Sequence, residues 1–268
     1  IDIGSEAGKG VIITDGGPVA YHRLPSGVNY GEAAEKLRDE LLHKAGLSLK
    51  DIDGIVATGQ GAGNVAFSHR QATDTRCCAR GINSVFPSAR TVIDVQAQSS
   101  QIIQLNENGR VINFAASEKC AAGSGRFLTV IANVLRIDIA DIGPLSLKSR
   151  NPITFTTGCA VFGESEAISR VAEGVAIEDI LAGVHQSLAS KIAALSKRVG
   201  INMDCAISGG GGLDEGLIST IEKTLGIKLL VPPHPQFITA LGAAIIAAEK
   251  GAAPNRTNQA GEHLGGEL

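Results

Sequence analysis

The chain has 268 residues, a net charge of −3, 44% hydrophobic residues and 19% charged residues. This length and composition are typical of a globular protein with material for one large or two medium lobes, and they exclude a disordered chain. The small negative charge offers no electrostatic basis for binding nucleic acid or an anionic membrane surface, and with 3% aromatic residues base stacking is also disfavoured.

The first part of the chain is predicted to start with β-structure and continue with helices. Residues 1–24 are expected to form two short strands joined by a glycine-rich turn, and residues 31–47 form an amphipathic helix. A strand is predicted at 54–59 and a helix through about 69–85. This order of elements is the first of two similar patterns.

The second pattern begins near residue 91. Residues 91–117 predict strand, loop, strand, turn and strand. The later elements are expected to be helices at 124–136, 160–173, 177–199, 214–225 and 236–249, with strands at 204–209 and 227–232. A β-rich start followed by helices therefore occurs twice, which predicts a duplicated α/β fold with two lobes around a ligand cleft.

The segment D-I-G-S-E-A-G-K at residues 2–9 has the features of a phosphate loop, with an acid at a strand end followed by a glycine turn. Backbone N–H groups around Gly4 and Ser5 are expected to hold phosphate oxygens. Asp2 is expected to hold Mg²⁺ through water, and Lys9 to meet phosphate charge. Glycine turns between strands are common, so this segment alone indicates a nucleotide site only weakly.

Two further segments support nucleotide binding. The second loop, D-V-Q-A-Q-S-S, again places an acid, Asp94, at a strand end, with Gln98 four residues later. In the third segment, S-G-G-G-G-L-D-E-G, a glycine run would let a flat ligand such as adenine lie against the backbone. The run consists of Gly209, Gly210, Gly211 and Gly212. A flexible strand–helix connection is the alternative for the run alone, but three such segments in this order favour a nucleotide.

The order of these segments, ending in PHPQFITALGAAIIA, resembles the acetate and sugar kinase/Hsp70/actin superfamily. Two cysteine motifs, KCAAGSGRF and GCAVFGESE, are similar to one branch, the BadF/BadG/BcrA/BcrD-type ATPases. That branch contains the benzoyl-CoA reductase ATPases and the activators of 2-hydroxyacyl-CoA dehydratases. The resemblance implies a duplicated actin-like (ribonuclease H-like) fold. Its first lobe would be 1–90 plus 240–268, with phosphate loop 1, and its second lobe 91–239, with phosphate loop 2, the cysteine motifs and the glycine run.

The five cysteines match no disulfide framework, which favours reduced thiols or thiolates on a metal. Cys120 and Cys159 each precede a predicted helix, where the helix dipole and unpaired N–H groups favour a thiolate. A [4Fe–4S] cluster needs four thiolates, so a second chain would have to supply two; buried core thiols are the alternative. The resemblance likewise implies one cluster that bridges two ATPase subunits, whereas Cys77, Cys78 and Cys205 are expected to be structural.

The resemblance implies ATP-dependent low-potential electron transfer. The chain opens on IDIG without a charged leader, and no apolar stretch approaches the ~20 residues of a membrane span, so a cytoplasmic protein is expected. The implied cofactors are ATP or ADP, Mg²⁺ and the shared cluster, with Gln98 and Asp94 in catalysis and Gln98 positioning water. The implied partners are a second identical or homologous ATPase subunit, an acyl-CoA dehydratase or benzoyl-CoA reductase component, and reduced ferredoxin or flavodoxin as electron donor.

The second loop departs from the pattern that the activators usually have, Asp-Ile-Gly-Gly-Gln-Asp-Ser-Lys. Here Gln96, Ala97, Ser99 and Gln101 replace Gly, Gly, Asp and Lys. In the first loop, Glu6 stands where Thr is more usual, which sets an anion near the phosphates. These departures make ATP binding a firmer expectation than rapid hydrolysis.

Two other functions are consistent with the same residues. One is a metal-free small-molecule kinase of the superfamily, which would need a carboxylate base such as Asp74 or Asp94. The other is a nucleotide-sensing subunit without turnover, which the altered second loop suggests. Iron content separates the first from electron transfer, and a hydrolysis assay beside a binding assay separates the second.

Overall fold

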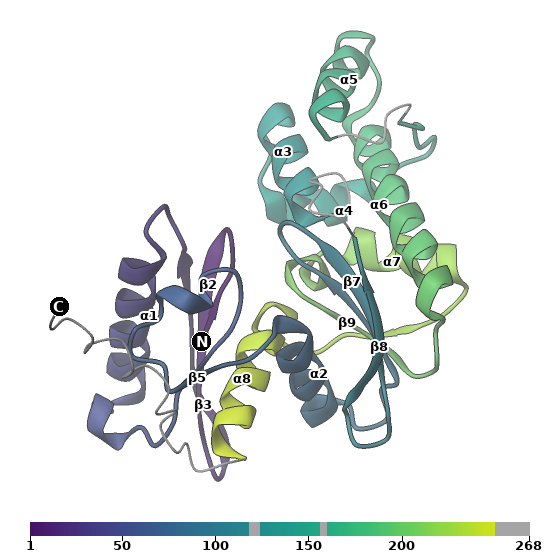
Figure 1. The fold of residues 1–268 in the computed structure, drawn as a ribbon. Helices are drawn as coiled ribbons and strands as arrows, with labels where there is room; N and C mark the ends of the chain where they lie inside the picture. Colours follow the sequence, from purple (N-terminus) through teal and green to yellow (C-terminus); the bar gives the residue numbers. More distant parts are fainter. Residues whose placement is uncertain (118–123, 156–159, 250–268) are drawn as a thin grey trace, which may run out of the picture.

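The computed structural model describes residues 1–117, 124–155 and 160–249. Two β-sheets lie side by side, each with helices packed against it, and the helices α2 (Asp74–Val85) and α8 (Ile238–Ala248) lie between them (Figure 1). The predicted lobe boundaries, 1–90 plus 240–268 and 91–239, stay predictions.

The first sheet starts with three antiparallel strands, not the two expected. They are β1 (Asp2–Ile3), β2 (Ala7–Thr14) and β3 (Gly17–Pro25). The extra strand arises because the turn after Ile3 folds β1 back, so that Asp2 pairs with Lys9. The short strands β4 (Val56–Ala57) and β5 (Arg70–Gln71) pair in parallel, and Thr58 bridges to Asp2 in parallel. Through that bridge the order is β3-β2-β1-β4-β5.

The second sheet has five strands in the order β10-β9-β6-β7-β8. They are β6 (Thr91–Val95), β7 (Ser100–Leu105), β8 (Val111–Ala116), β9 (Cys205–Ser208) and β10 (Leu229–Leu230). The first three are antiparallel, whereas β9 runs parallel to β6 and β10 parallel to β9. This is the order and direction of the first sheet, element for element, so the same unit occurs twice.

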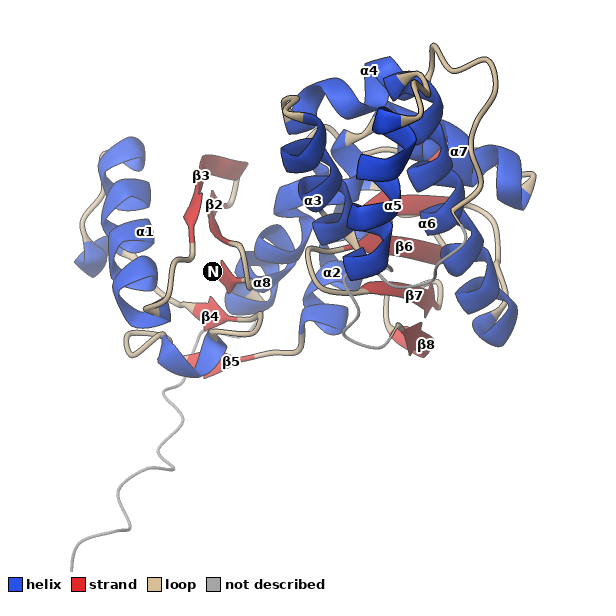
Figure 2. Cartoon of the chain, turned by 90° about the horizontal axis from the view of Figure 1, so that it is seen from above, coloured by secondary structure: helices blue, strands red, loops and turns tan. Residues whose placement is uncertain are grey.

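Helices cover both faces of the second sheet (Figure 2). On one face lie α3 (Gly125–Leu135), α4 (Ile142–Ser146), α5 (Ala160–Ala172), α6 (Ile177–Val199) and α7 (Glu215–Leu225). Alternate strand residues point to the two faces: Ile93 packs among residues of α3 and α6, whereas Val92 packs with Ile82 of α2. Both faces are therefore apolar, as expected for a buried sheet.

The first sheet is covered by α1 (Tyr30–Ala45) and α8. Asn29 caps α1, because its side chain accepts hydrogen bonds from the first-turn N–H groups, and Leu37 is fully buried beneath it. On α8, Leu241 lies in a cluster with Val11 of β2, and Ala243 in one with Val56 of β4. The helix predicted at 236–249 is thus present as α8, and it packs against both β2 and β4 of this sheet.

The helices α2 and α8 touch at their backbones. A Cβ atom on Gly81 would overlap the carbonyl oxygen of Ile238, and one on Gly242 would overlap the carbonyl oxygen of Cys77. α2 begins later than the predicted residue 69, because Thr73 caps it and the chain just before forms β5. Glycine on both helices therefore permits α2 and α8 to cross with their backbones in close contact.

The strand β8 ends the second sheet and carries apolar side chains into solvent. Ile112 is 58% exposed and Phe114 is 55% exposed, and they lie two residues apart on one face. Within the described ranges, no helix combines the length and apolarity needed to cross a membrane.

Candidate functional site

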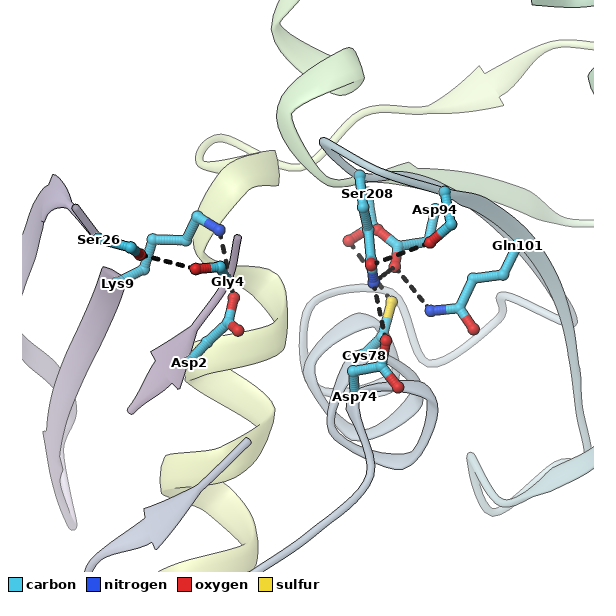
Figure 3. Close-up of polar contacts among 11 residues, drawn as sticks. Asp2, Gly4, Lys9, Ser26, Asp74, Cys78, Asp94, Gln101 and Ser208 are labelled. Carbon is cyan, nitrogen blue, oxygen red and sulfur yellow. Dashed lines mark hydrogen bonds and ion pairs between the residues drawn. The ribbon is translucent and has the colours of Figure 1, made fainter. Parts of the chain in front are cut away.

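The first predicted phosphate loop forms the turn between β1 and β2. Asp2 is mostly buried, and the Lys9 ammonium donates to its Oδ2 at 3.3 Å. The loop closes where the N–H of Gly4 donates to the carbonyl of Ala7 at 3.1 Å, and Ser26 donates from its hydroxyl to the carbonyl of Gly4 at 2.7 Å (Figure 3). The carboxylate and ammonium named in the sequence therefore lie together.

The second predicted loop follows β6, and its acid is held by two amides. Asp94 is fully buried, and its Oδ2 accepts from Nε2 of Gln96 at 2.7 Å and from Nε2 of Gln101 at 2.9 Å. The Oδ1 atom is buried too and accepts no hydrogen bond from the described residues. Burial raises the pKa of Asp94, and the hydrogen bonds from Gln101 and Gln96 oppose part of that rise.

The same two amides connect Asp94 to the start of α2. Gln96 Nε2 also donates to Asp74 Oδ2 at 3.1 Å, and Thr75 donates from its hydroxyl to Gln101 Oε1 at 2.9 Å. Gln98, the predicted water-positioning residue, lies half-buried in the loop, and its role stays a prediction. The amides that contact Asp94 are Gln96 and Gln101, which the sequence signalled only as departures from the family pattern.

The glycine run lies beside this acid, at the end of β9. Gly209 has a φ of 83°, and a Cβ there would lie 2.7 Å from the carbonyl carbon of Val95 and 2.8 Å from Asp94 Oδ1. Cβ atoms on Gly211 and Gly212 would meet Val95 and Pro235, each at 2.6 Å. Gly210 faces open space. Three of the glycines are thus needed for packing, and Gly210 presents an open backbone.

Asp214 anchors the end of the run. Its Oδ1 accepts from the N–H of Leu217 at 2.9 Å and so caps α7, while its Oδ2 lies 2.9 Å from Nε2 of the fully buried His185 of α6. A helix cap paired with a buried imidazole fixes the position of the glycine run relative to α6.

The two halves present equivalent groups at equivalent places. Thr58 bridges Asp2 and precedes Gly59, which has a φ of 84°, just as Ser208 lies opposite Asp94 and precedes Gly209. A Cβ on Gly59 would overlap Asp2 Oδ1. The two sheets therefore share one arrangement: a carboxylate on one strand, Asp2 or Asp94, lies against a glycine, Gly59 or Gly209, that follows the neighbouring parallel strand.

The N-terminus of α3 contacts both loops. The N–H of Gly125 donates to the carbonyl of Gln96 at 2.8 Å, and that of Arg126 to the carbonyl of Ala97 at 3.0 Å. The Arg126 guanidinium lies 3.8 Å from Oε1 of Glu6 in the first loop. One helix end thus connects the two loops across the halves.

These residues fit a nucleotide with a divalent cation. Mg²⁺ prefers carboxylate oxygens, and Asp94 offers a buried oxygen that lacks a donor in the described part of the chain. Lys9 supplies positive charge near Asp2, and Gly210 supplies an exposed backbone surface. The Asp2, Lys9, Asp94 and Gly210 positions can therefore serve the roles predicted for them, while those roles stay predictions. Gly4 and Ser5 lie in the turn where phosphate binding is predicted.

The described cysteines do not fit a cluster. Cys77, Cys78 and Cys205 are fully buried, and burial raises the pKa of Cys77 to about 11 and that of Cys205 to about 12, which disfavours the thiolate that binds iron. The predicted ligands Cys120 and Cys159 lie outside the described residues. Among the described residues, no group of three or more His, Cys, Asp or Glu side chains could hold a metal.

Comparisons with known proteins give a consistent result. Residues 1–247 match the BadF/BadG/BcrA/BcrD ATPase family. The 2-hydroxyisocaproyl-CoA dehydratase activator of Clostridioides difficile is 36% identical over 93% of this chain and 94% of its own. A benzoyl-CoA reductase subunit of Thauera aromatica is 35% identical over 80% of this chain and 78% of its own.

Solved structures agree with the sequence matches. The C. difficile activator with bound ADPNP superposes with a TM-score of 0.89, covering 93% of each chain at 37% identity. Component A of the (R)-2-hydroxyglutaryl-CoA dehydratase of Acidaminococcus fermentans gives 0.90 at 36% identity, covering 94% of this chain and 98% of that one. With the matching strand orders of the two sheets, these likenesses confirm the predicted duplicated actin-like fold.

Proposed function

This chain belongs to the BadF/BadG/BcrA/BcrD ATPase family, and we propose that it couples ATP to low-potential electron transfer. The acceptor would be an acyl-CoA dehydratase or benzoyl-CoA reductase component, because the relatives are named as dehydratase activators or as part of a reductase. A [4Fe–4S] cluster held by Cys120 and Cys159 of two subunits would supply the one-electron centre. A reduced ferredoxin or flavodoxin would donate the electron in the cytoplasm.

One observation carries the nucleotide part of the proposal. Asp2 and Asp94 stand at equivalent strands of the two halves, each against the backbone turn after a neighbouring strand. Two carboxylates in this arrangement suit a cation on a polyphosphate, and Lys9 adds charge for the phosphate oxygens. The relative whose structure contains ADPNP superposes over most of this chain, which supports the same site.

The contacts of α3 support a response to the nucleotide. Its first two N–H groups bind the second loop, and Arg126 approaches Glu6 of the first. A phosphate group between the loops would compete with Glu6 for Arg126, because both are anions. A hinge motion between the two sheets with their helices would then change how the two subunits are oriented around the [4Fe–4S] cluster that they are proposed to share.

Iron content tests the electron-transfer part. We would measure iron and acid-labile sulfide on anaerobically purified protein, together with its mass in solution. Roughly four irons per dimer are expected, with loss in Cys120→Ser and Cys159→Ser and retention in Cys205→Ser, which changes a buried core thiol. An iron-free monomer that binds nucleotide would contradict the proposal.

A nucleotide-sensing subunit without turnover is the second candidate. It is favoured by the contacts at Asp94, where both Gln96 and Gln101 occupy Oδ2. Calorimetric ATP binding beside a phosphate-release assay separates the two functions. Binding with release no faster than in a heat-denatured control would support the sensing role and contradict an ATPase.

A further inference from the structure

Gln96 holds two acidic side chains with a single amide group. Its Nε2 donates to Asp94 Oδ2 at 2.7 Å and to Asp74 Oδ2 at 3.1 Å, which uses both hydrogens of the amide. The two carboxylates come from different elements, β6 and the first turn of α2. The partial positive charge of this amide thus offsets the repulsion between the two neighbouring carboxylates.

The backbone of the same residue is attached to α3. The carbonyl of Gln96 accepts from the N–H of Gly125 at 2.8 Å, and the carbonyl of Ala97 accepts from the N–H of Arg126 at 3.0 Å. The backbone of Gly125 lies close to that of Gln96, since a Cβ on Gly125 would be 3.2 Å from the Gln96 carbonyl oxygen. Gln96 therefore links the buried acid directly to the first turn of a helix.

A divalent cation at Asp94 would compete with this amide. The burial of Asp94 and the nearby Asp74 charge both disfavour an unneutralised carboxylate, and both raise its pKa. A full positive charge neutralises the two acids better than an amide dipole does. A cation on either oxygen of Asp94, the donor-free Oδ1 included, draws negative charge away from Oδ2 and so weakens the hydrogen bonds that Oδ2 accepts from Gln96 and Gln101.

We propose that Gln96 is a gate on the cation of the nucleotide: its amide occupies Asp94 and Asp74 until the cation displaces it, and its release loosens the first turn of α3. The inference rests on the proposed nucleotide site and deepens it. Gln96 is then the residue through which cation binding reaches α3, the helix that begins within the first cysteine motif. Gly125 follows Cys120 by five residues in the sequence.

The substitution Gln96→Met tests the gate, because methionine keeps the side-chain length and removes both donors. We would titrate ATP by calorimetry in EDTA and then in increasing Mg²⁺. The variant is expected to need about tenfold less Mg²⁺ for half-maximal enhancement of ATP binding, which corresponds to ~1.4 kcal/mol. The control Gln104→Met removes an amide of β7 that contacts the carbonyl of Gly200, and it is expected to behave like the unmodified protein.

Hydrogen exchange on the full protein tests the link to α3. In the unmodified protein, amides of residues 124–135 are expected to exchange several-fold faster with Mg²⁺ and ATP than with ATP in EDTA. In Gln96→Met they are expected to exchange fast in both conditions. Equal exchange in both conditions for the unmodified protein would overturn the link.

The outcomes also separate the gate from the proposed function. If ATP binds the unmodified protein but Gln96→Met leaves the Mg²⁺ requirement unchanged, the gate is wrong and the nucleotide site stands. If no ATP binds to the unmodified protein in either condition, the nucleotide site itself is wrong, and the gate with it. A melting temperature of Gln96→Met close to that of Gln104→Met shows that the comparison is between folded proteins.

Discussion

Cys77 and Cys78 are neighbours on α2, yet they pack into different halves of the molecule. Cys77 lies in the cluster formed by α8 and Val56 of the first sheet. Cys78 lies against the second sheet, and its thiol donates to the hydroxyl of Ser208 at 3.4 Å (Figure 3). One helix turn thus contacts both β4 of the first sheet and β9 of the second, the strands beside those that carry the two candidate phosphate loops.

These two thiols and Cys205 are expected to be unreactive in the folded protein. Burial raises the pKa of all three, to about 11 for Cys77 and about 12 for Cys205, so the thiolate fraction at pH 8 is small and access is blocked. Iodoacetamide treatment followed by peptide mass spectrometry should leave them unmodified until denaturant is added. Rapid native labelling of Cys205 would contradict the burial of β9.

Asp94→Asn is expected to stabilise the nucleotide-free protein at neutral pH. Because burial raises the pKa of Asp94, the folded protein holds the proton more tightly than the unfolded chain, so stability falls as pH rises from the ordinary Asp value of 3.8 through the raised one. The melting temperature of Asp94→Asn should exceed that of the unmodified protein by about 2–4 °C at pH 7.5, for ~1 kcal/mol, and match it near pH 4.

Asp179→Asn is the control of opposite sign for this prediction. Hydrogen bonds, first from Ser149 and also from the backbone of Asn151 and Arg150, lower the pKa of Asp179, so its ionised form stabilises the fold above the ordinary pKa and the contribution is lost in acid. This variant should melt lower than the unmodified protein at pH 7.5 and approach it at low pH. A difference for Asp94→Asn that does not change with pH would show that the charge is not the cause.

Gly242→Ala is expected to destabilise the protein by about 1–3 kcal/mol, because the added methyl overlaps the Cys77 carbonyl where α2 crosses α8. Urea denaturation measures the free energy of unfolding. Gly63→Ala makes the same change where a Cβ meets nothing within 4 Å, and it should stay within about 0.5 kcal/mol. Equal effects of the two changes would argue against a tight crossing.

Glu6→Gln is expected to increase ATP affinity about fivefold at low salt, for ~1 kcal/mol, because it removes an anion beside the candidate phosphate site and frees Arg126. The increase should shrink in 0.5 M salt, where charges on the surface are screened. The free energy of unfolding should change by less than about 0.5 kcal/mol, since the ion pair is largely exposed. Glu35→Gln, on the exposed face of α1, should leave affinity unchanged.

Long periodic elements were predictable from the sequence. The helix expected at 177–199 has those bounds as α6, and the strand–turn–strand region at 91–117 forms β6, β7 and β8. Short elements were not, because their length is set by pairing with distant residues. β5 forms only because Arg70 and Gln71 meet Val56 and Ala57, and it replaces the predicted start of a helix.

The site was predictable as a set of loops but not as a set of contacts. Acids at strand ends and glycine runs have a local signature, so Asp2, Asp94 and the glycine run were found from the sequence. The contact of Gln96 with Asp74 spans 22 residues and depends on where α2 crosses the second sheet. No local pattern reports such a crossing, and Gln96 was therefore noted only as a departure.

The β8 edge has a consequence for handling the protein. An outer strand with unpaired N–H and C=O groups invites another chain to add a strand, and exposed apolar side chains strengthen that addition. Ile112 and Phe114 supply such side chains here. Concentrated samples should therefore aggregate from this edge first, and Ile112→Lys should improve solubility while leaving the buried face of β8 unchanged.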